Sequence, residues 1–297
     1  MRSAIREYFD AAGVLEVDTP VLVTAGVTDP ATPSLRVLSP AGEQSFLATS
    51  PEYHMKRLLA AGLGDIYSLG PAFRADEHGR RHRSEFALVE WYRVGFDLHA
   101  LMADVAALIE AAGVELPVRG VDYTEVFLEA TGLDPLTTSD EALAAAARQA
   151  AGGLALDPDD RALALDLLFS HRVVPALERG ALTFVTGYPA CQAALARLDP
   201  ARPDTALRFE AFAAGMELAN GFEELTDPVE QRARFFADNR LRRRRSLPTM
   251  PIDEAFLAAL AHGLPRCAGV ALGLDRLLMV RLGESEIARV RPFAEPP

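Results

Sequence analysis

Two segments in the first third of the chain are rich in apolar residues, and each predicts a β-strand. The segments are residues 65–73 and 85–96, the second with apolar positions at Phe86 and Leu88. A segment rich in charge and histidine, residues 74–84, lies between them. The two strands are therefore predicted to form a hairpin with an unusually long polar loop.

Apolar residues at helical spacing, such as Ile5, Tyr8 and Phe9, mark the other elements. The pattern predicts helices over residues 1–13, 52–61, 98–112, 139–149, 158–171, 228–246, 253–262 and 275–282. It predicts further strands over residues 14–20, 46–48, 182–188, 207–213, 216–222 and 269–273. Because the strands do not alternate one by one with helices, the order favours an α+β fold, with an antiparallel β-sheet flanked by helices, over a doubly wound sheet.

Length and composition are those of a globular protein, with 297 residues of which 49% are hydrophobic and 24% charged. No apolar run approaches the roughly 20 residues that a membrane span needs, and residues 1–13 lack the apolar core of a signal peptide. Cys191 and Cys267 stand far apart, which excludes a disulfide framework. These features predict a cytoplasmic protein with no membrane partner. They predict one domain over residues 1–297, with a helical insertion at about 115–180.

The chain carries 30 Lys plus Arg against 42 Asp plus Glu, a formal net charge of −12. That balance argues against a dedicated nucleic-acid binder, because such proteins neutralise phosphates with basic side chains. Every basic residue except Lys56 is an arginine, which we interpret as a genome-level bias. Residues 240–245 hold five arginines, and two interpretations stay open: a solvated helix end, or a docking patch for an acidic partner.

The charged loop between the first two predicted strands offers a candidate site for phosphates. Arg74 follows one strand directly, and residues 80–86 bring further cationic side chains on the return. Guanidinium groups bind phosphate through paired hydrogen bonds and stabilise the charge that develops in nucleotidyl transfer. The loop is therefore a candidate triphosphate site, with a solvated hairpin tip as the alternative.

Three glutamates recur every seven residues across the second predicted hairpin, at Glu210, Glu217 and Glu224. Carboxylates among apolar neighbours are costly to bury unless they are paired or bind a metal ion. Mg²⁺ with ATP phosphates fits this pattern, since Mg²⁺ takes only one or two protein carboxylates. An edge strand with its polar face in water is the alternative interpretation.

Small residues punctuate the last predicted strand at Gly269, Ala271 and Gly273, so that a flat group could approach the backbone there. Arg276 then opens a helix, where it would face an anion near the N-terminal amides. A tight packing contact between strand and helix is the alternative. The chain has neither a Walker-type lysine loop nor a GxGxxG after an opening strand, which excludes the two commonest nucleotide folds.

Taken in order, these segments resemble the three signature motifs of class II aminoacyl-tRNA synthetases. Residues 15–20 resemble motif 1, residues 73–90 resemble motif 2 and residues 269–276 resemble motif 3. The resemblance covers essentially the whole chain. It implies the class II catalytic core and, through motif 1, a homodimer.

Within this family the lysyl-tRNA synthetase subgroup fits best, through residues 217–225 and the pair Pro51-Glu52. Residues 50–59 and 90–93 are most similar to the paralogues of that subgroup that attach (R)-β-lysine to elongation factor P. This resemblance implies a ligase that uses ATP and Mg²⁺ to activate lysine or β-lysine as an adenylate. The implied acceptor is a lysine side chain of elongation factor P, and not tRNA.

The resemblance also assigns roles to residues of this chain. It implies that Arg74 and Arg276 are catalytic. The implied ATP site is formed by Arg74, Ala75, Asp76, His82, Arg83, Glu217, Leu218, Gly273 and Arg276. The implied amino-acid site is formed by Ser50, Pro51, Glu52, Glu90, Tyr92, Asn220, Glu224 and Ala271, and the implied Mg²⁺ ligands are Glu210 and Glu217.

Some positions depart from the motifs of lysyl-tRNA synthetases. Ala271 stands where they usually have the middle glycine of G-x-G-x-G, and the paralogues share this alanine. A methyl group in a pocket discriminates by about 1–3 kcal/mol, so it would shift the preference among lysine isomers. Ala75-Asp76 replaces the usual Asn-Glu of motif 2, and Arg83-Ser84 replaces its Asn-Pro.

Two other functions stay open. The first is a lysine-tRNA ligase, but motif 1 begins almost at Met1 and leaves no room for the N-terminal anticodon-binding domain of that subgroup. The second is a non-catalytic, synthetase-like amino-acid sensor, which the departures at Ala75 and Arg83 would suit. The presence of Arg74 and Arg276 argues against a sensor.

Overall fold

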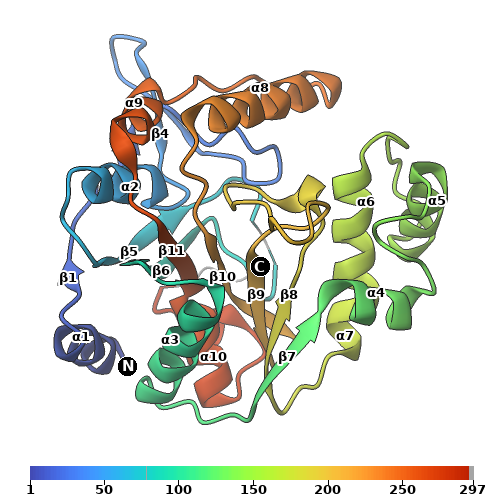
Figure 1. Ribbon diagram of the computed structural model, residues 1–297, viewed down its shortest axis with the longest axis horizontal. Coiled ribbons are helices and arrows are strands. Elements are labelled where there is room, and N and C mark those ends of the chain that lie inside the picture. The colour runs from blue at the N-terminus through green and yellow to red at the C-terminus, as the bar shows by residue number, and fades with distance from the viewer. Residues whose placement is uncertain (78, 294–297) are drawn as a thin grey trace. The chain divides into compact units, whose positions relative to one another are not determined.

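A computed structural model describes residues 1–77 and 79–293 (Figure 1). The chain forms two compact units: the first consists of Met1–Val114 and the chain from Glu224 onward, and the second of Glu115–Glu223. Both units combine helices with strands that are mostly antiparallel, which confirms the predicted α+β class. That residues 1–297 act as one catalytic domain stays a prediction.

The first unit is built on four strands in the order β1-β5-β6-β11. Their bounds are β1 (Leu15–Glu16), β5 (Ile66–Phe73), β6 (Glu85–Val94) and β11 (Cys267–Gly273). β1 is parallel to β5, whereas β5, β6 and β11 run antiparallel. The predicted hairpin of residues 65–73 and 85–96 is thereby confirmed. In its register Tyr92 lies opposite Gly269, and Glu90 lies opposite Ala271.

Helices accompany this sheet, and most of them bury apolar side chains. They are α1 (Arg2–Ala11), α2 (Glu52–Ala60), α3 (Leu98–Ala111), α8 (Pro228–Arg244), α9 (Glu254–Gly263) and α10 (Leu274–Leu282), followed by a short 3₁₀ helix (Ile287–Arg289). Phe9 of α1 is fully buried and stacks on Tyr67 with ring centroids 4.2 Å apart. α2 and α9 lie side by side (Figure 1), joined by the stacked rings of Tyr53 and Phe256.

A small second sheet of the first unit has the order β2-β4-β3. Its strands are β2 (Leu22–Val23), β3 (Arg36–Leu38) and β4 (Gln44–Leu47). The strand predicted over 14–20 is wrong for most of its length, because only Leu15–Glu16 pairs in the main sheet. Pro20 lacks a backbone donor and cannot continue a ladder. Such two- and three-residue strands are too short to show an alternating pattern.

The second unit holds the strand order β10-β9-β8-β7. Its strands are β7 (Val118–Asp122), β8 (Leu182–Thr186), β9 (Arg208–Ala213) and β10 (Met216–Glu223). The hairpin of β9 and β10 is confirmed, and its turn places Ala214 and Gly215 at φ values of 52° and 72°. β7 pairs in parallel with β8, so the region from 115 to 180 supplies a strand as well as helices.

The helical insertion consists of short helices around a cluster of buried aromatic and aliphatic side chains. They are α4 (Tyr123–Thr131), α5 (Asp140–Ala150), α6 (Arg161–Leu168), a π-helical segment (Phe169–Val173), α7 (Val174–Ala176) and a 3₁₀ turn (Ala190–Gln192). Ser139 caps α5, as predicted, by accepting a hydrogen bond from the Ala142 amide. α4 was not predicted, although Asp122 caps its N-terminus through Thr124.

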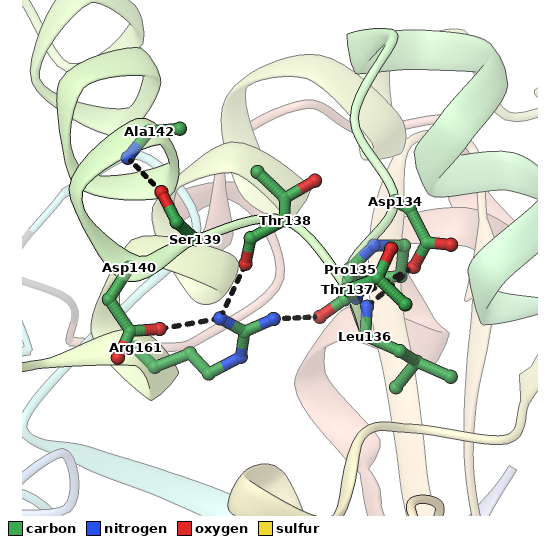
Figure 2. Close-up of polar contacts among 9 residues, drawn as sticks. All are labelled: Asp134, Pro135, Leu136, Thr137, Thr138, Ser139, Asp140, Ala142 and Arg161. Atoms are coloured by element: carbon green, nitrogen blue, oxygen red, sulfur yellow. Dashed lines mark hydrogen bonds and ion pairs between the residues drawn. The ribbon is translucent and has the colours of Figure 1, made fainter.

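Arg161 fastens the loop that joins α4 to α5 (Figure 2). Its guanidinium donates to the carbonyl of Pro135 at 2.7 Å, to the carbonyl of Thr138 at 2.9 Å and to the Asp140 carboxylate. Three N–H donors of one planar group thus add to the loop's own hydrogen bond from the Thr138 amide to the Asp134 carbonyl. No helix in the described part of the chain is long and apolar enough to cross a membrane.

Candidate active site

Three glutamates and one lysine meet in the interior of the first unit. Glu52 begins α2, Glu90 lies on β6, and Glu224 follows β10, where its amide donates to the Cys267 carbonyl at the start of β11. Glu90 and Glu224 are only 2% and 3% exposed. The ammonium of Lys56 lies 2.6 Å from Glu52 Oε1 and 2.5 Å from Glu224 Oε2. We refer to Glu52, Glu90 and Glu224 as the carboxylate cluster.

Two further residues shape this cluster. The Tyr92 hydroxyl donates to Glu90 Oε1 at 2.8 Å. Because Gly269 has no side chain, the side chains of Tyr92 and Glu224 can both approach the backbone of β11. A Cβ at this position would lie 2.3 Å from the Tyr92 ring and 2.6 Å from Glu224 Oε1. The small residues of the last predicted strand indicated that a flat group approaches its backbone. At Gly269 this group is the ring of Tyr92. The second oxygen of Glu90 and Oε1 of Glu224 are buried and have no hydrogen-bond partner among the described residues.

The surroundings change the ionisation of these groups. Burial and the nearby charge of Glu52 raise the pKa of Glu90 to about 8. Burial likewise raises the pKa of Glu224 to about 8, although Lys56 opposes this. Burial alone would lower the pKa of Lys56, but the facing carboxylates of Glu224 and Glu52 hold it above its usual range. The cluster thus contains carboxylates that lack enough positive charge around them.

Arg74 lies directly after β5, as the sequence predicts. Its guanidinium carbon is 5.0 Å from the centroid of the Phe86 ring, and its amide donates to the Ser84 carbonyl at 2.9 Å. The ring contact holds the guanidinium plane in one orientation. Its Nε is buried and has no hydrogen-bond partner among the described residues, so it can serve an anionic ligand.

Other side chains of the charged loop make contacts within the loop itself. Arg83 donates to the carbonyls of Gly79 and His82 at 2.7 and 3.0 Å, so its side chain closes the loop on itself. His82 lies 3.7 Å from the Glu77 carboxylate. Asp76 is exposed, with a φ of 60° in the left-handed region. Arg83 is therefore not part of a fully solvated hairpin tip, the alternative interpretation of this loop.

Arg276 stands in the first turn of α10, directly after β11, which confirms the predicted passage from strand to helix. Gly273 occupies the N-cap position of this helix. The helix start is fixed by Asp275, whose carboxylate accepts from the Ala87 amide at 2.8 Å and from Arg291 at 3.1 Å. These contacts tie α10 to β6, the strand that carries Glu90.

A small hollow opens beside the start of α2. Ser50 and Glu52 lie on its wall, together with Tyr53 and Asp253. The Ser50 hydroxyl accepts from the Glu52 amide at 3.2 Å and so supports the first turn of the helix. Glu52, whose side chain is 19% exposed, is thus the member of the carboxylate cluster that lies nearest the surface.

The second unit holds the other pair of predicted carboxylates. Burial and the charge of Glu217 raise the pKa of Glu210 to about 7, with Arg208 opposing. The guanidinium of Arg208 donates to Glu210 and Asn220 and packs over the Tyr188 ring, 4.5 Å from its centroid. No group of three or more acidic, histidine or cysteine side chains in the described residues is arranged as a metal site.

The predicted site residues fall into both units. The first unit contains Ser50, Pro51, Glu52, Arg74, Ala75, Asp76, His82, Arg83, Glu90, Tyr92, Glu224, Ala271, Gly273 and Arg276. The second unit contains Glu210, Glu217, Leu218 and Asn220, of which Leu218 is 2% exposed. Arg208 is not among the predicted site residues, although its position two residues before Glu210 on a strand places both side chains on one face.

The arginine run at the end of α8 is partly solvated and partly structural, and its role as a docking patch for an acidic partner stays a prediction. Arg243 and Arg244 are exposed, as expected of a solvated helix end. Arg242 is 2% exposed and donates to the carbonyls of Pro248 and Asp29 at 2.7 and 3.1 Å. One of the five arginines therefore fixes the chain around it and is not available to a partner.

Comparison with known proteins agrees with this geometry. The family model for class II tRNA synthetases (D, K and N) matches residues 1–296. Three curated relatives, all named elongation factor P–(R)-β-lysine ligase, come from Vibrio cholerae, Haemophilus influenzae and Pectobacterium carotovorum. They are 47%, 47% and 45% identical to this chain. Each alignment includes 98% of this chain, and the alignments include 92%, 91% and 92% of the respective relatives. The chain belongs to the class II tRNA synthetase family.

Proposed function

We propose that the chain is an ATP-dependent ligase that activates (R)-β-lysine, or lysine, and transfers it to a lysine side chain of elongation factor P. The relatives that bear this name match almost the whole chain. The single observation that carries the proposal is the buried carboxylate cluster, because carboxylates buried without enough cations suit a ligand with ammonium groups.

Each end of such a substrate has matching groups on this chain. Glu90, Tyr92 and Glu224 would receive the side-chain ammonium, and Glu52 would receive the amino group nearest the carboxylate. Arg74 would bind the substrate carboxylate and the α-phosphate of ATP, since its Nε has no internal partner. Asn220 and Ser50 are proposed to complete the amino-acid site.

The proposed chemistry has two steps. A carboxylate oxygen of the amino acid attacks the α-phosphorus of ATP, the bond to the β-phosphate oxygen breaks, and pyrophosphate leaves. The amine of the acceptor lysine then attacks the carbonyl carbon of the adenylate, AMP leaves, and the amine loses a proton. Arg74 and Arg276 would position the reactants and offset the developing negative charge.

Mg²⁺ is proposed as the cofactor, and Glu210 and Glu217 would hold it. The donor set fits in kind, because both groups are carboxylates. Burial and the charge of Glu217 raise the pKa of Glu210 even though Arg208 pairs with it, and a divalent cation would relieve that repulsion. Mg²⁺ characteristically binds one or two carboxylates plus substrate phosphates, and it would there neutralise phosphate charge.

Adenylation and transfer can be measured separately. We expect purified protein to exchange pyrophosphate into ATP with at least one lysine isomer and to add the mass of that acyl group to elongation factor P. Lys56, the only lysine of the chain, is fully buried, so acyl label on protein belongs to the acceptor. Failure to exchange with every isomer would refute the ligase, and efficient charging of tRNA would favour a tRNA ligase.

A homodimer is also proposed, following the motif 1 resemblance. Large apolar side chains are exposed near the N-terminus, with Leu15 and Leu22 each 53% and Leu38 70% exposed. Apolar surface of this kind suits an interface between copies. The absence of a tRNA partner and a cytoplasmic location stay part of the proposal, and the net charge of −12 supports the former.

Affinity for the diamino acid is expected to rise with pH between 6 and 8 and to level off above. In the free protein Glu90 and Glu224 have pKa values of about 8, so they hold protons at neutral pH. Ammonium groups favour the ionised carboxylates, so binding must release these protons. Below pH 8 the dissociation constant should therefore fall about tenfold per pH unit for each proton released.

Calorimetry in two buffers with different ionisation enthalpies would count the released protons. ATP binding, measured in the same buffers, serves as the control, because ATP does not meet the carboxylate cluster in this proposal. An affinity for lysine isomers that stays constant from pH 6 to 8 would contradict the assignment of the cluster.

A further inference from the structure

Lys56 is buried in the middle of the carboxylate cluster. Its side chain is 0% exposed, and its ammonium group lies between Glu52 Oε1 at 2.6 Å and Glu224 Oε2 at 2.5 Å. Glu52 precedes Lys56 by four residues on α2, which is the favourable order for an ion pair within a helix. The ammonium also lies 5.8 Å from the centre of the Phe256 ring on α9. These contacts hold it at one position.

The residue type at this position departs from the composition of the chain. Every other basic residue is an arginine, so a general bias toward arginine does not account for Lys56. An ammonium is a compact point charge, whereas a guanidinium is a larger plane with five donors in a fixed fork. A side chain that is 0% exposed and reaches two carboxylate oxygens, at 2.5 and 2.6 Å, suits a compact ammonium. The site therefore holds one compact positive charge.

The charges of the cluster lead to a simple count. Glu52, Glu90 and Glu224 contribute −3 when ionised, and Lys56 contributes +1, which leaves −3 + 1 = −2. The other titratable groups at the cluster, Tyr92 and Cys267, are neutral, because burial raises the pKa of each well above its usual range. A lysine isomer brings two ammonium groups, which match this remainder.

We propose that Lys56 is a positioning and specificity-determining residue: it fixes Glu52 and Glu224 on either side of its ammonium and leaves a net charge of −2 for the two ammonium groups of a diamino acid. This inference rests on the proposed function. Without Lys56 the cluster would have three carboxylates for two cations, and two of them would lose the contact that orients them.

A second cation of the same unit, partly buried, provides a matched comparison. Arg93 follows Tyr92 on β6 and therefore points to the opposite face of the sheet. Its Nε lies 3.6 Å from Asp65 and 3.5 Å from Asp104, so it too stands between two carboxylates. Its side chain is 11% exposed. Removing this cation disturbs a partly buried ionic group without touching the carboxylate cluster.

The test compares Lys56→Met and Arg93→Met with the unaltered protein by calorimetric binding of L-lysine, (R)-β-lysine and ATP. We expect Lys56→Met to weaken diamino-acid binding by about 30-fold or more, with ATP affinity changed less than about threefold. Arg93→Met should lower the melting temperature and leave diamino-acid affinity within about threefold. Equal loss of affinity for lysine and ATP in Lys56→Met, or no loss, would overturn the proposal.

Two analogues test the charge count on the unaltered protein, so the proposal does not depend on folding of Lys56→Met. Norleucine lacks the side-chain ammonium, and 6-aminohexanoate lacks the other amino group. Each should bind about 100-fold more weakly than L-lysine or (R)-β-lysine. Binding of either analogue as tight as lysine would overturn the count. Binding of diamino acids without transfer to elongation factor P would refute the proposed function alone, and no binding of any diamino acid would refute both.

Discussion

Replacing Gly269 with alanine is expected to reduce kcat/KM for the diamino acid at least about 100-fold. The new Cβ would lie 2.3 and 2.5 Å from two ring carbons of Tyr92 and 2.6 Å from Glu224 Oε1. Neither neighbour is the free end of a flexible chain: Tyr92 is 2% and Glu224 3% exposed. Both must move, and displacement of substrate-positioning groups by about 1 Å costs about 100-fold in rate. Pyrophosphate exchange with lysine isomers measures the loss.

Gly70→Ala is the matched control for this substitution. Gly70 lies on β5, next to β6 in the same sheet, and a Cβ added there would meet no atom within 4 Å. We expect it to keep its activity within about threefold. Gly269→Ala should also lower the melting temperature by several degrees, since overpacking costs about 1–3 kcal/mol. Full activity in Gly269→Ala would show that Tyr92 and Glu224 do not hold the substrate.

The sequence predicted best those parts of the fold whose patterns are long. The strands of 65–73 and 85–96 were recognised because their apolar-rich segments extend over eight or more residues, and they form β5 and β6. β2 and β3 span two and three residues and were missed, since so short a segment has no period. α4 was missed because its apolar residues face a local cluster, and only its cap at Asp122 marks the start.

The sequence indicated which residues form the candidate site, but it did not indicate which of them contact one another. The motifs pointed to Glu52, Glu90 and Glu224 singly, but nothing in their spacing shows that Lys56 lies between two of them. Two signals were present: Lys56 is the only lysine, and it follows Glu52 by four residues. We interpreted the first as composition alone. A contact between α2 and the residue after β10 joins segments about 170 positions apart, and only tertiary structure reveals it.

The departures from the synthetase motifs now have a structural context. Arg83 replaces an asparagine of motif 2, and its Nη1 donates to the carbonyls of Gly79 and His82. An arginine that closes its own loop can preserve the shape of the loop without touching the nucleotide. Ala271 lies opposite Glu90 in the register of β11 and β6, so its methyl group stands next to the carboxylate cluster. That position agrees with a role in choosing among lysine isomers.

Replacing Arg74 with alanine is expected to lower pyrophosphate exchange by about 1,000-fold while the fold persists. The variant loses the one guanidinium in this loop whose Nε is buried without a partner among the described residues. Arginines that stabilise phosphoryl or acyl transition states contribute about 10³–10⁵ in rate. The lost contact with Phe86 is worth about 1 kcal/mol, so circular dichroism and the melting temperature should change little. Arg119→Ala, a surface arginine that is 59% exposed, is the control and should keep full exchange.

Arg74→Lys separates a requirement for positive charge from a requirement for geometry. A lysine keeps the charge but loses both the planar contact with Phe86 and the paired donors that bind a carboxylate or a phosphate. Exchange should therefore stay at least about 100-fold below that of the unaltered protein. If Arg74→Lys were fully active, Arg74 would act only as a charge, and its fixed orientation over Phe86 would have no catalytic meaning. If Arg74→Ala kept its exchange activity, the adenylation centre would lie elsewhere; if the unaltered protein bound lysine without any exchange, the sensor alternative would replace the ligase.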